Sequence, residues 1–319
     1  MSRSTAFKVG RIAFVLLVAA FLVKVGADNA DQLRHVHLRA RVVPLVAAAP
    51  LVVLAGLLLP LGWRRLVSAW GPELPLRVGL RIWVLSQASR YVVTGVATLA
   101  SRTALAAKAG VARSLAAAST VVEIGVLVVL AGVAAAACLP SRVLAGPVRL
   151  AGVVVGLGGL AALPVVLRLG GRAVPRLEAL RPDALRPDRL YEAIGIDAAS
   201  IAVRSAAFVL FAVGLLPHIG ARDALLLAGS LQGAALIGLI GITPAGIGVR
   251  EGVLAELLHR GLGQVTLGDA AAVAVAWRAY EFLFEIGWVV LATAMGRTTQ
   301  VDKGRADQDE IAGGGRPAG

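Results

Sequence analysis

Residues 80–113 read LRIWVLSQASRYVVTGVATLASRTALAAKAGVAR, and this stretch decides the fold because it fits neither a soluble helix nor a full membrane span. Its apolar runs are short and alternate with polar and charged side chains. About twelve helical residues extend about 18 Å, whereas a bilayer core of about 30 Å needs about 20 apolar residues. We therefore expect two half-helices that break near Thr94 and Gly95 and form a re-entrant hairpin. Such a break requires protein or a watery cavity around it.

The composition of the whole chain places this hairpin in a membrane protein. Of 319 residues, 58% are apolar and 16% are charged, against about 45–50% and about 25% in soluble domains. This balance excludes a soluble enzyme, a disordered chain and a fibrous repeat. The net charge of +13 indicates basic cytoplasmic loops rather than a nucleic-acid partner. The single cysteine, Cys138, excludes an intramolecular disulfide and a cysteine-based zinc site.

Several other segments are long and apolar enough to span a bilayer. Between them we expect an interfacial helix at 28–41 and a polar surface loop at 170–197, where a repeated Leu-Arg-Pro-Asp favours turns. Residues 1–295 are expected to form one integral membrane domain, and the polar, Gly-rich residues 296–319 a disordered cytoplasmic tail. The expected full spans are about 12–27, 42–61, 114–139, 148–169, 198–217 and 269–295.

Residues 222–262 leave two topologies open. Ala224–Ile242 is long enough to cross the membrane, and a Gly/Pro break and a short helix follow it. A single crossing would leave the basic tail outside, whereas a second hairpin keeps the tail inside, on the same side as the basic segments 62–113 and 170–197. The positive-inside rule favours the hairpin. The expected architecture is an all-α polytopic membrane protein with about six full transmembrane helices and two opposed re-entrant hairpins. This inverted-repeat-like plan is typical of transporters.

Charged side chains within the apolar segments are the strongest functional signal. At about 2.5–3.5 kcal/mol each, seven charges facing lipid would cost roughly 20 kcal/mol, more than a domain's net stability of about 5–15 kcal/mol. They must pair between helices or line a polar site. Arginine binds phosphate in bidentate geometry, so we expect Arg102 and Arg250, each after the break of its hairpin, to hold an anionic headgroup jointly. The seven residues are Arg102, Glu123, Arg250, Glu251, Arg278, Glu281 and Glu285.

The stretch Thr243–Leu254, TPAGIGVREGVL, resembles the PGGxGxxE signature of the flippase-like transmembrane region associated with lysylphosphatidylglycerol synthases. Ala245 stands where a second glycine is usual, and Thr243 where an apolar residue is common. The resemblance covers most of 10–295. The first half of the family's pattern, an aromatic residue, a glycine, an arginine and a later glutamate, is resembled by Arg90-Tyr91, Gly95, Arg102 and Glu123. Arg278 resembles the arginine of the family's last span.

The resemblance implies a flippase-like protein of the cell membrane that moves a phospholipid or a lipid-linked polyprenyl-phosphate glycan. Because only residues 296–319 follow the last expected span, we expect no soluble aminoacyltransferase domain. Membrane lipids are the expected partners, and a glycosyltransferase or a lipid-synthesising enzyme is a further candidate. The expected substrate-binding residues are Arg102, Glu123, Arg250, Glu251, Arg278 and Glu281, and the expected hairpin breaks are Gly95, Pro244, Gly246 and Gly248.

Two other functions stay open at this point. A membrane enzyme that modifies a lipid headgroup would need a positioned base, for which Glu123 or Glu251 could serve. An accessory subunit would hold a glycosyltransferase or synthase at the membrane through the loop 170–197. The sequence contains no P-loop, no Gly-x-Ser-x-Gly motif and no zinc-protease motif. We therefore expect no catalytic activity, no metal and no cofactor.

Overall fold

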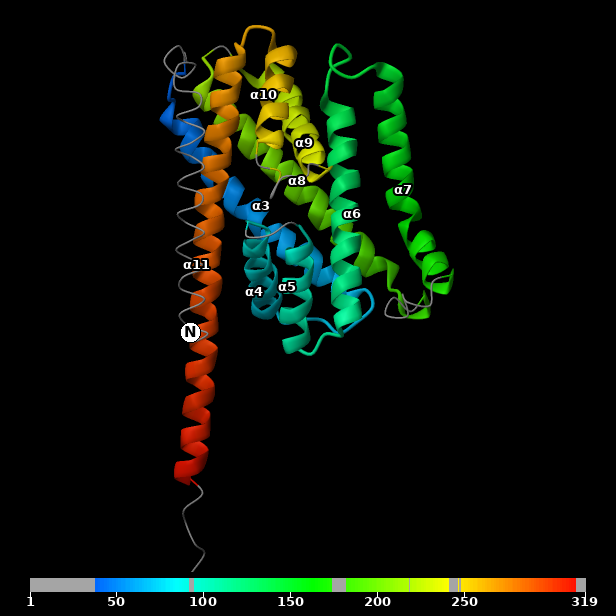
Figure 1. Ribbon diagram of the computed structural model, residues 1–319, viewed down its shortest axis with the longest axis vertical. Helices are drawn as coiled ribbons and strands as arrows, with labels where there is room; N and C mark the ends of the chain where they lie inside the picture. Colours follow the sequence, from blue (N-terminus) through cyan, green and yellow to red (C-terminus); the bar gives the residue numbers. More distant parts are fainter. Residues whose placement is uncertain are drawn as a thin grey trace, which may run out of the picture.

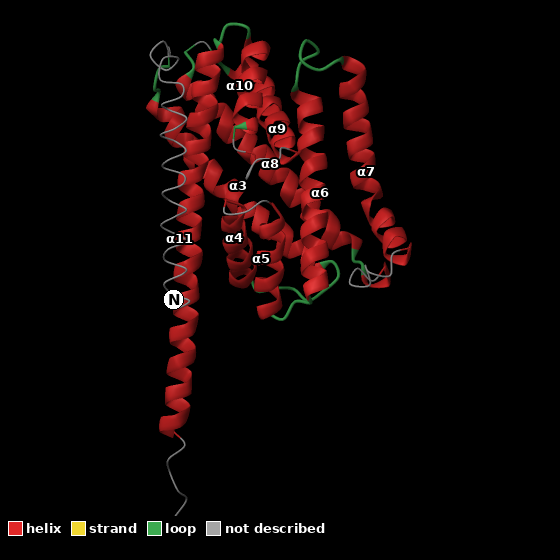
Figure 2. Ribbon diagram, viewed as in Figure 1, coloured by secondary structure: helices red, strands yellow, loops and turns green. Residues whose placement is uncertain are grey.

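The computed structural model describes residues 38–313 except 92–94, 174–181, 218, 241–245 and 247. Within these residues the chain is entirely helical and contains no β-strand (Figure 2). The helices in chain order are α3 Val42–Ser68, α4 Leu76–Gln87, η1 Ala88–Tyr91, α5 Gly95–Lys108, α6 Arg113–Cys138, α7 Gly146–Ala173, η3 Pro182–Ala184, α8 Pro187–Leu215, η4 Ala221–Asp223, α9 Ala224–Ile240, α10 Val249–Leu262 and α11 Leu267–Gly313.

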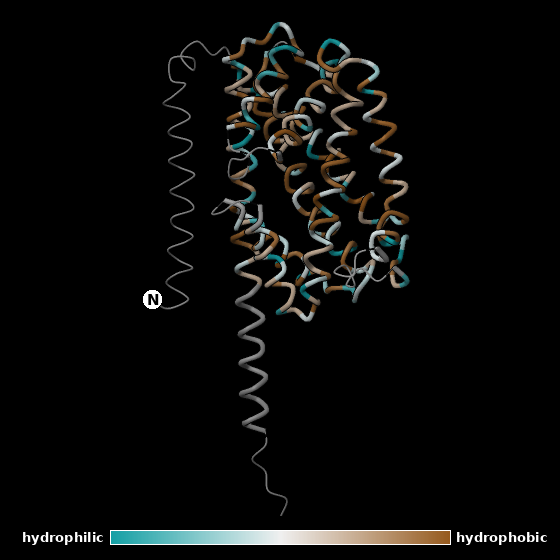
Figure 3. The backbone as a smooth tube through the Cα atoms, turned by 45° about the vertical axis from the view of Figure 1, so that its right-hand side comes forward, coloured by the Kyte–Doolittle hydropathy of each residue, from teal (hydrophilic) through white to brown (hydrophobic). Residues whose placement is uncertain are grey.

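Four of these helices, α3, α6, α7 and α8, are long and apolar enough to cross a membrane. They correspond to the second to fifth expected spans. Hydrophobic residues predominate along the helices, and hydrophilic residues gather mainly at the helix ends (Figure 3). Monomeric soluble proteins rarely expose large apolar patches, so these helices indicate a multi-pass membrane protein. On α7 alone the exposed apolar side chains are Val148, Leu150, Val154, Val155, Leu157, Val165, Val166 and Leu169.

Two pairs of shorter helices approach the middle of the bundle from opposite ends (Figure 1). Helices α4 and α5 pack against each other, and so do α9 and α10. The first pair is joined to α3 and α6 at the lower end of the view, and the second pair is joined to α11 at the upper end. The C-terminal ends of α4 and α9 and the N-terminal ends of α5 and α10 therefore all point toward the centre.

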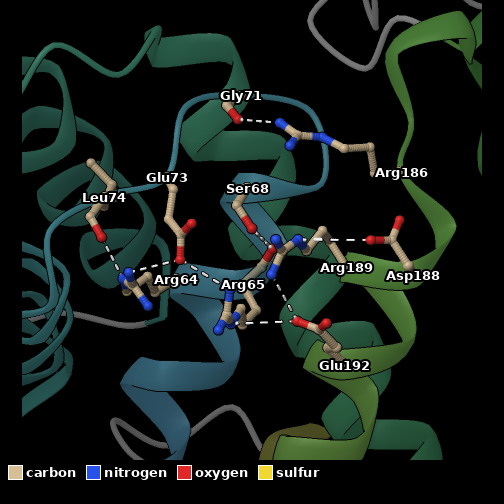
Figure 4. A network of polar contacts seen from close by, with 10 residues as sticks. All are labelled: Arg64, Arg65, Ser68, Gly71, Glu73, Leu74, Arg186, Asp188, Arg189 and Glu192. Atoms are coloured by element: carbon tan, nitrogen blue, oxygen red, sulfur yellow. Dashed lines mark hydrogen bonds and ion pairs between the residues drawn. The ribbon is translucent and has the colours of Figure 1, made fainter.

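Helices α3 and α8 cross the bundle together and pack along their length. At one end, a surface network of ion pairs connects them to the segment that leads into α4 (Figure 4). Glu73 accepts hydrogen bonds from Arg64 at 2.9 Å and from Arg65 at 3.0 Å. Arg65 also pairs with Glu192 of α8 at 3.5 Å, and Arg186 donates to the Gly71 carbonyl at 2.9 Å. The network fixes the position at which the first helix pair leaves α3.

The prediction of a polar loop over 170–197 was wrong for residues 170–173, which end α7, and for residues 187–197, which form the first turns of α8. The second Leu-Arg-Pro-Asp starts this helix, because proline suits the first helical position and Asp188 suits the positive end of the helix dipole. The first copy forms the short turn η3. Proline and aspartate are thus signals for helix starts as well as for turns.

The end of the expected interfacial helix 28–41 is also different, since residues 38–41 are not helical. The backbone N–H groups of Arg39 and Arg41 donate to the carbonyls of Leu215 and Gly214 at 2.9 and 2.8 Å. These bonds satisfy carbonyls at the C-terminal end of α8, which have no partner within the helix. The rest of 28–41, the expected span 12–27 and Pro244 lie outside the described residues.

Helix α11 continues through most of the segment that we expected to be disordered, and its backbone is helical to Gly313. Its last part runs well beyond the other helices (Figure 1). Residues 297–312 contain a single glycine, Gly304, and no proline. The run of three glycines begins only at Gly313, so the strong helix breakers lie where the helix ends.

We expect Gly246→Ala to destabilise the protein more than Gly248→Ala. Both glycines have positive φ, 69° and 86°, a conformation that costs other residues roughly 1–2 kcal/mol. At Gly246 an added Cβ would also lie 2.7 Å from the carbonyl oxygen of Gly238, whereas at Gly248 nothing lies within 4 Å. Thermal unfolding in detergent measures the difference. Gly158→Ala, on the open surface of α7, is the control and should not lower the melting temperature; equal melting of all three variants would contradict the prediction.

Candidate functional site

The first group of buried charges, the Arg102 cluster, connects α3, α4, α5 and α6. Arg102 and Glu123 are 1% and 2% exposed and form an ion pair. The Trp83 indole N–H donates to the second carboxylate oxygen of Glu123 at 2.8 Å, and Arg102 Nε donates to Ser86 Oγ at 3.1 Å. The guanidinium carbon lies 5.4 and 5.3 Å from the ring centroids of Trp63 and Trp83, within the range of a cation–π interaction. The Arg102 guanidinium and the Glu123 carboxylate are therefore paired with each other and with neighbouring polar and aromatic side chains.

The second group, the Glu281 cluster, connects α8, α10 and α11. Glu281 accepts hydrogen bonds from Arg204 at 2.5 Å and from Arg250 at 3.3 Å, and it lies 3.8 Å from Arg278 Nη1. Arg278 Nε is also 3.7 Å from Glu251 Oε1. Three arginines thus share two glutamates, and several of the distances are long for ion pairs.

The helix break before α10 places two members of the Glu281 cluster. Gly248 caps the helix with a positive φ of 86°, and its N–H donates to Glu251 Oε2 at 2.7 Å. This bond satisfies one of the N–H groups that a helix start leaves free. Arg250 and Glu251 consequently lie in the first turn of α10. On α11, Arg278 and Glu281 are three residues apart and share one face.

A cavity of about 160 Å³ is lined mainly by α3, α4, α8 and α11. Helix α4 contributes Trp83, Val84 and Gln87, and α10 contributes Arg250. A cavity of this volume with polar lining groups has room for several waters or for a phosphate-sized group. The polar lining residues are Gln87, Ser200, Arg204, Arg250, Glu281 and Glu285.

The structure divides the predicted site residues between the two clusters. Arg250, Glu251, Arg278 and Glu281 lie together, and of these Arg250 and Glu281 face the cavity. We expected Arg102 and Arg250 to hold one anion jointly, but the structure does not place both of them at the cavity. Arg102 is fully buried, pairs with Glu123 and is not a lining residue. Its nearest connection to the cavity is Trp83, which lines the cavity and is held by Glu123.

Three residues with roles in these clusters were missed by the sequence reasoning. Arg204 lies within the expected span 198–217, so its charge was a usable signal. Asp197 was assigned to the preceding loop and is instead inside α8, where it is 2% exposed. Trp83 gave no such signal, because nothing in its local sequence indicates a bond to Glu123.

In the part of the chain that the structure describes, no group of three or more His, Cys, Asp or Glu side chains is placed to hold a metal ion. No family model matches the chain, and no curated protein matches its sequence.

We expect Glu123→Gln to lower the stability strongly, because it breaks the ion pair of the buried Arg102 guanidinium. Breaking one side of a buried pair costs about 3–5 kcal/mol. The double variant Arg102→Met with Glu123→Gln should recover much of this loss, since no unpaired charge remains. Unfolding in detergent of the two single variants and the double variant measures the coupling.

The matched control is Glu256→Gln on α10, whose partner Arg260 is 72% exposed. An exposed pair contributes about 0–1 kcal/mol, so this variant should unfold almost as the unmodified protein does. If Glu123→Gln and Glu256→Gln have the same small effect, the Arg102 cluster does not hold the helices together.

Proposed function

We propose that this protein is a flippase-like transporter that moves the headgroup of a phospholipid, or of a lipid-linked polyprenyl-phosphate glycan, across the cell membrane. The observation that carries this proposal is a buried polar cavity that α4 and α10, one helix from each opposed pair, help to line, with Arg204, Arg250, Glu281 and Glu285 among its lining residues. Polar sites at the meeting point of inverted elements are a recurrent plan in transporters. The lipid tails stay in the bilayer beside the apolar helix faces.

The Glu281 cluster suits a phosphate that enters and leaves. Guanidinium groups bind phosphate in bidentate geometry, and Arg204 and Arg250 both reach the cavity. In the empty site both pair with the single carboxylate of Glu281 at 2.5 and 3.3 Å, and an entering phosphate competes with this carboxylate. Alternating access in such transporters comes from one element moving against another, so the two helix pairs are proposed to move relative to each other during transport.

The membrane arrangement that we propose follows from the same charges. The pairs α4–α5 and α9–α10 are re-entrant hairpins, the full spans number about six, and both termini are cytoplasmic. The resemblance of Thr243–Leu254 to the flippase-like region supports this arrangement. The chain acts as a transporter and not as an enzyme, and a glycosyltransferase or a lipid-synthesising enzyme supplies its substrate.

Reconstitution into liposomes with labelled lipids tests the proposal. We expect Arg250→Lys to stay folded and to slow headgroup movement by about tenfold, a barrier change of about 1.4 kcal/mol, because lysine keeps the charge and loses the planar fork. Arg260→Lys on the same helix is the control, since Arg260 is 72% exposed, and it should transport at the unmodified rate.

Two outcomes would oppose this function. Full transport by both Arg250→Lys and Arg204→Lys would leave these arginines as structural pairs only. If the unmodified protein moves none of several anionic phospholipids and polyprenyl phosphates, the transport proposal fails. An accessory or lipid-modifying role would then be the better explanation.

The C-terminal tail should be cytoplasmic, because that places Arg297, Lys303 and Arg305 on the positive-inside side. A C-terminal alkaline phosphatase fusion is therefore expected to be inactive, whereas a C-terminal green fluorescent protein fusion is expected to fluoresce. An active phosphatase fusion would mean that residues 222–262 cross the membrane once.

A further inference from the structure

Asp197 of α8 is a buried acid without a matching charge of its own. It is 2% exposed, and its Oδ1 has no hydrogen-bond partner. The charged groups that act on it electrostatically are Glu123 from α6 and Arg102 from α5. From α3 it meets Gly62, where an added Cβ would overlap Asp197 Oδ1. The fold therefore leaves room for this carboxyl group, but the only positively charged side chain among the described residues that acts on it, Arg102, is already paired with Glu123.

Charge balance identifies the ligand that this site takes. Arg102 is already neutralised by Glu123, so an ionised Asp197 would leave an excess negative charge in the membrane interior. Such a charge is costly unless it is compensated. A hard metal cation needs several oxygen ligands, and the described residues place no group of three or more acidic, His or Cys ligands together. A single proton on Asp197 makes the group neutral and needs no further ligand.

One face of α8 connects this site with the cavity. Asp197, Ser200 and Arg204 are spaced at i, i+3 and i+7, which places them on the same side of the helix. Ser200 lines the cavity and donates a hydrogen bond to the Ala55 carbonyl at 3.0 Å. Arg204 binds Glu281 in the second cluster. A change of charge at Asp197 thus acts on the Arg102 cluster directly and on the cavity through one rigid helix.

We propose that Asp197 is a proton-binding site that couples headgroup movement to proton movement across the membrane; this rests on the proposed transport function. The carboxylate takes one proton from water on one side, forming an O–H bond, and releases it to water on the other side. When ionised, Asp197 competes with Glu123 for Arg102 and loosens the contact between α5 and α6. When protonated, it leaves that pair intact. The two protonation states therefore favour different positions of the first helix pair.

Liposomes with an imposed pH gradient test the coupling. With one proton per lipid, a gradient of one pH unit corresponds to about 1.4 kcal/mol and shifts the equilibrium ratio of labelled lipid between the leaflets about tenfold. We expect Asp197→Asn to equilibrate lipid without a gradient but to lose this shift. Asp188→Asn, at the exposed start of the same helix (67% side-chain exposure), should keep the full shift.

A second variant covers the case in which Asp197→Asn does not fold. Gly62→Ala displaces the carboxyl group without removing it and should reduce the shift, whereas Gly195→Ala, with open space around it, should not. If the unmodified protein moves lipid but its distribution ignores the gradient, or if Asp197→Asn keeps the shift, the coupling proposal fails and transport stands. If the unmodified protein moves no lipid, the transport proposal itself has failed. A shift driven by a sodium gradient in place of a pH gradient would also overturn proton coupling.

Discussion

A buried charge requires a counter-charge, and the central part of this structure depends on that constraint. Lipid offers no hydrophobic gain when helices associate, so membrane helices rely on close packing and polar contacts. Here Glu123 pairs with Arg102 and accepts a hydrogen bond from Trp83, and Glu281 pairs with arginines of α8, α10 and α11. Two carboxylates thereby position the helices that enclose the cavity. The apolar faces can then be uniform, because they need only to contact lipid.

At the helix break before α10, one buried carboxylate both caps the helix and joins the ion-pair network. A helix that starts inside the bundle leaves backbone N–H groups free at its first turn, and this is costly at membrane depth. At α10 Glu251 accepts the Gly248 N–H with one oxygen and faces Arg278 with the other. The same side chain thus completes the break and joins the ion-pair network. A break without such a residue would need water in its place.

Much of the architecture could be predicted because its causes are local. Long apolar runs give α3, α6, α7 and α8, and the short interrupted run 80–113 gives the pair α4–α5. The partners of the charges could not be predicted, because pairing depends on which helices meet. The start of α8 had a further consequence. Assigning Pro187 to a loop hid the fact that Asp197 lies inside a helix, and with it the polar face that continues to Arg204.

The two clusters differ in how readily their arginines can exchange a carboxylate for an entering anion. In the Arg102 cluster the ion pair is almost inaccessible and the aromatic rings close it, so an entering anion would first have to separate α4 from α5 and α6. In the Glu281 cluster Arg204 is 29% exposed and three of the ion-pair distances are 3.3–3.8 Å. Loose pairs give up less free energy when an anion displaces the carboxylate. The second cluster is therefore suited to exchange partners with a substrate, while the first keeps Trp83 in place as the opposite wall.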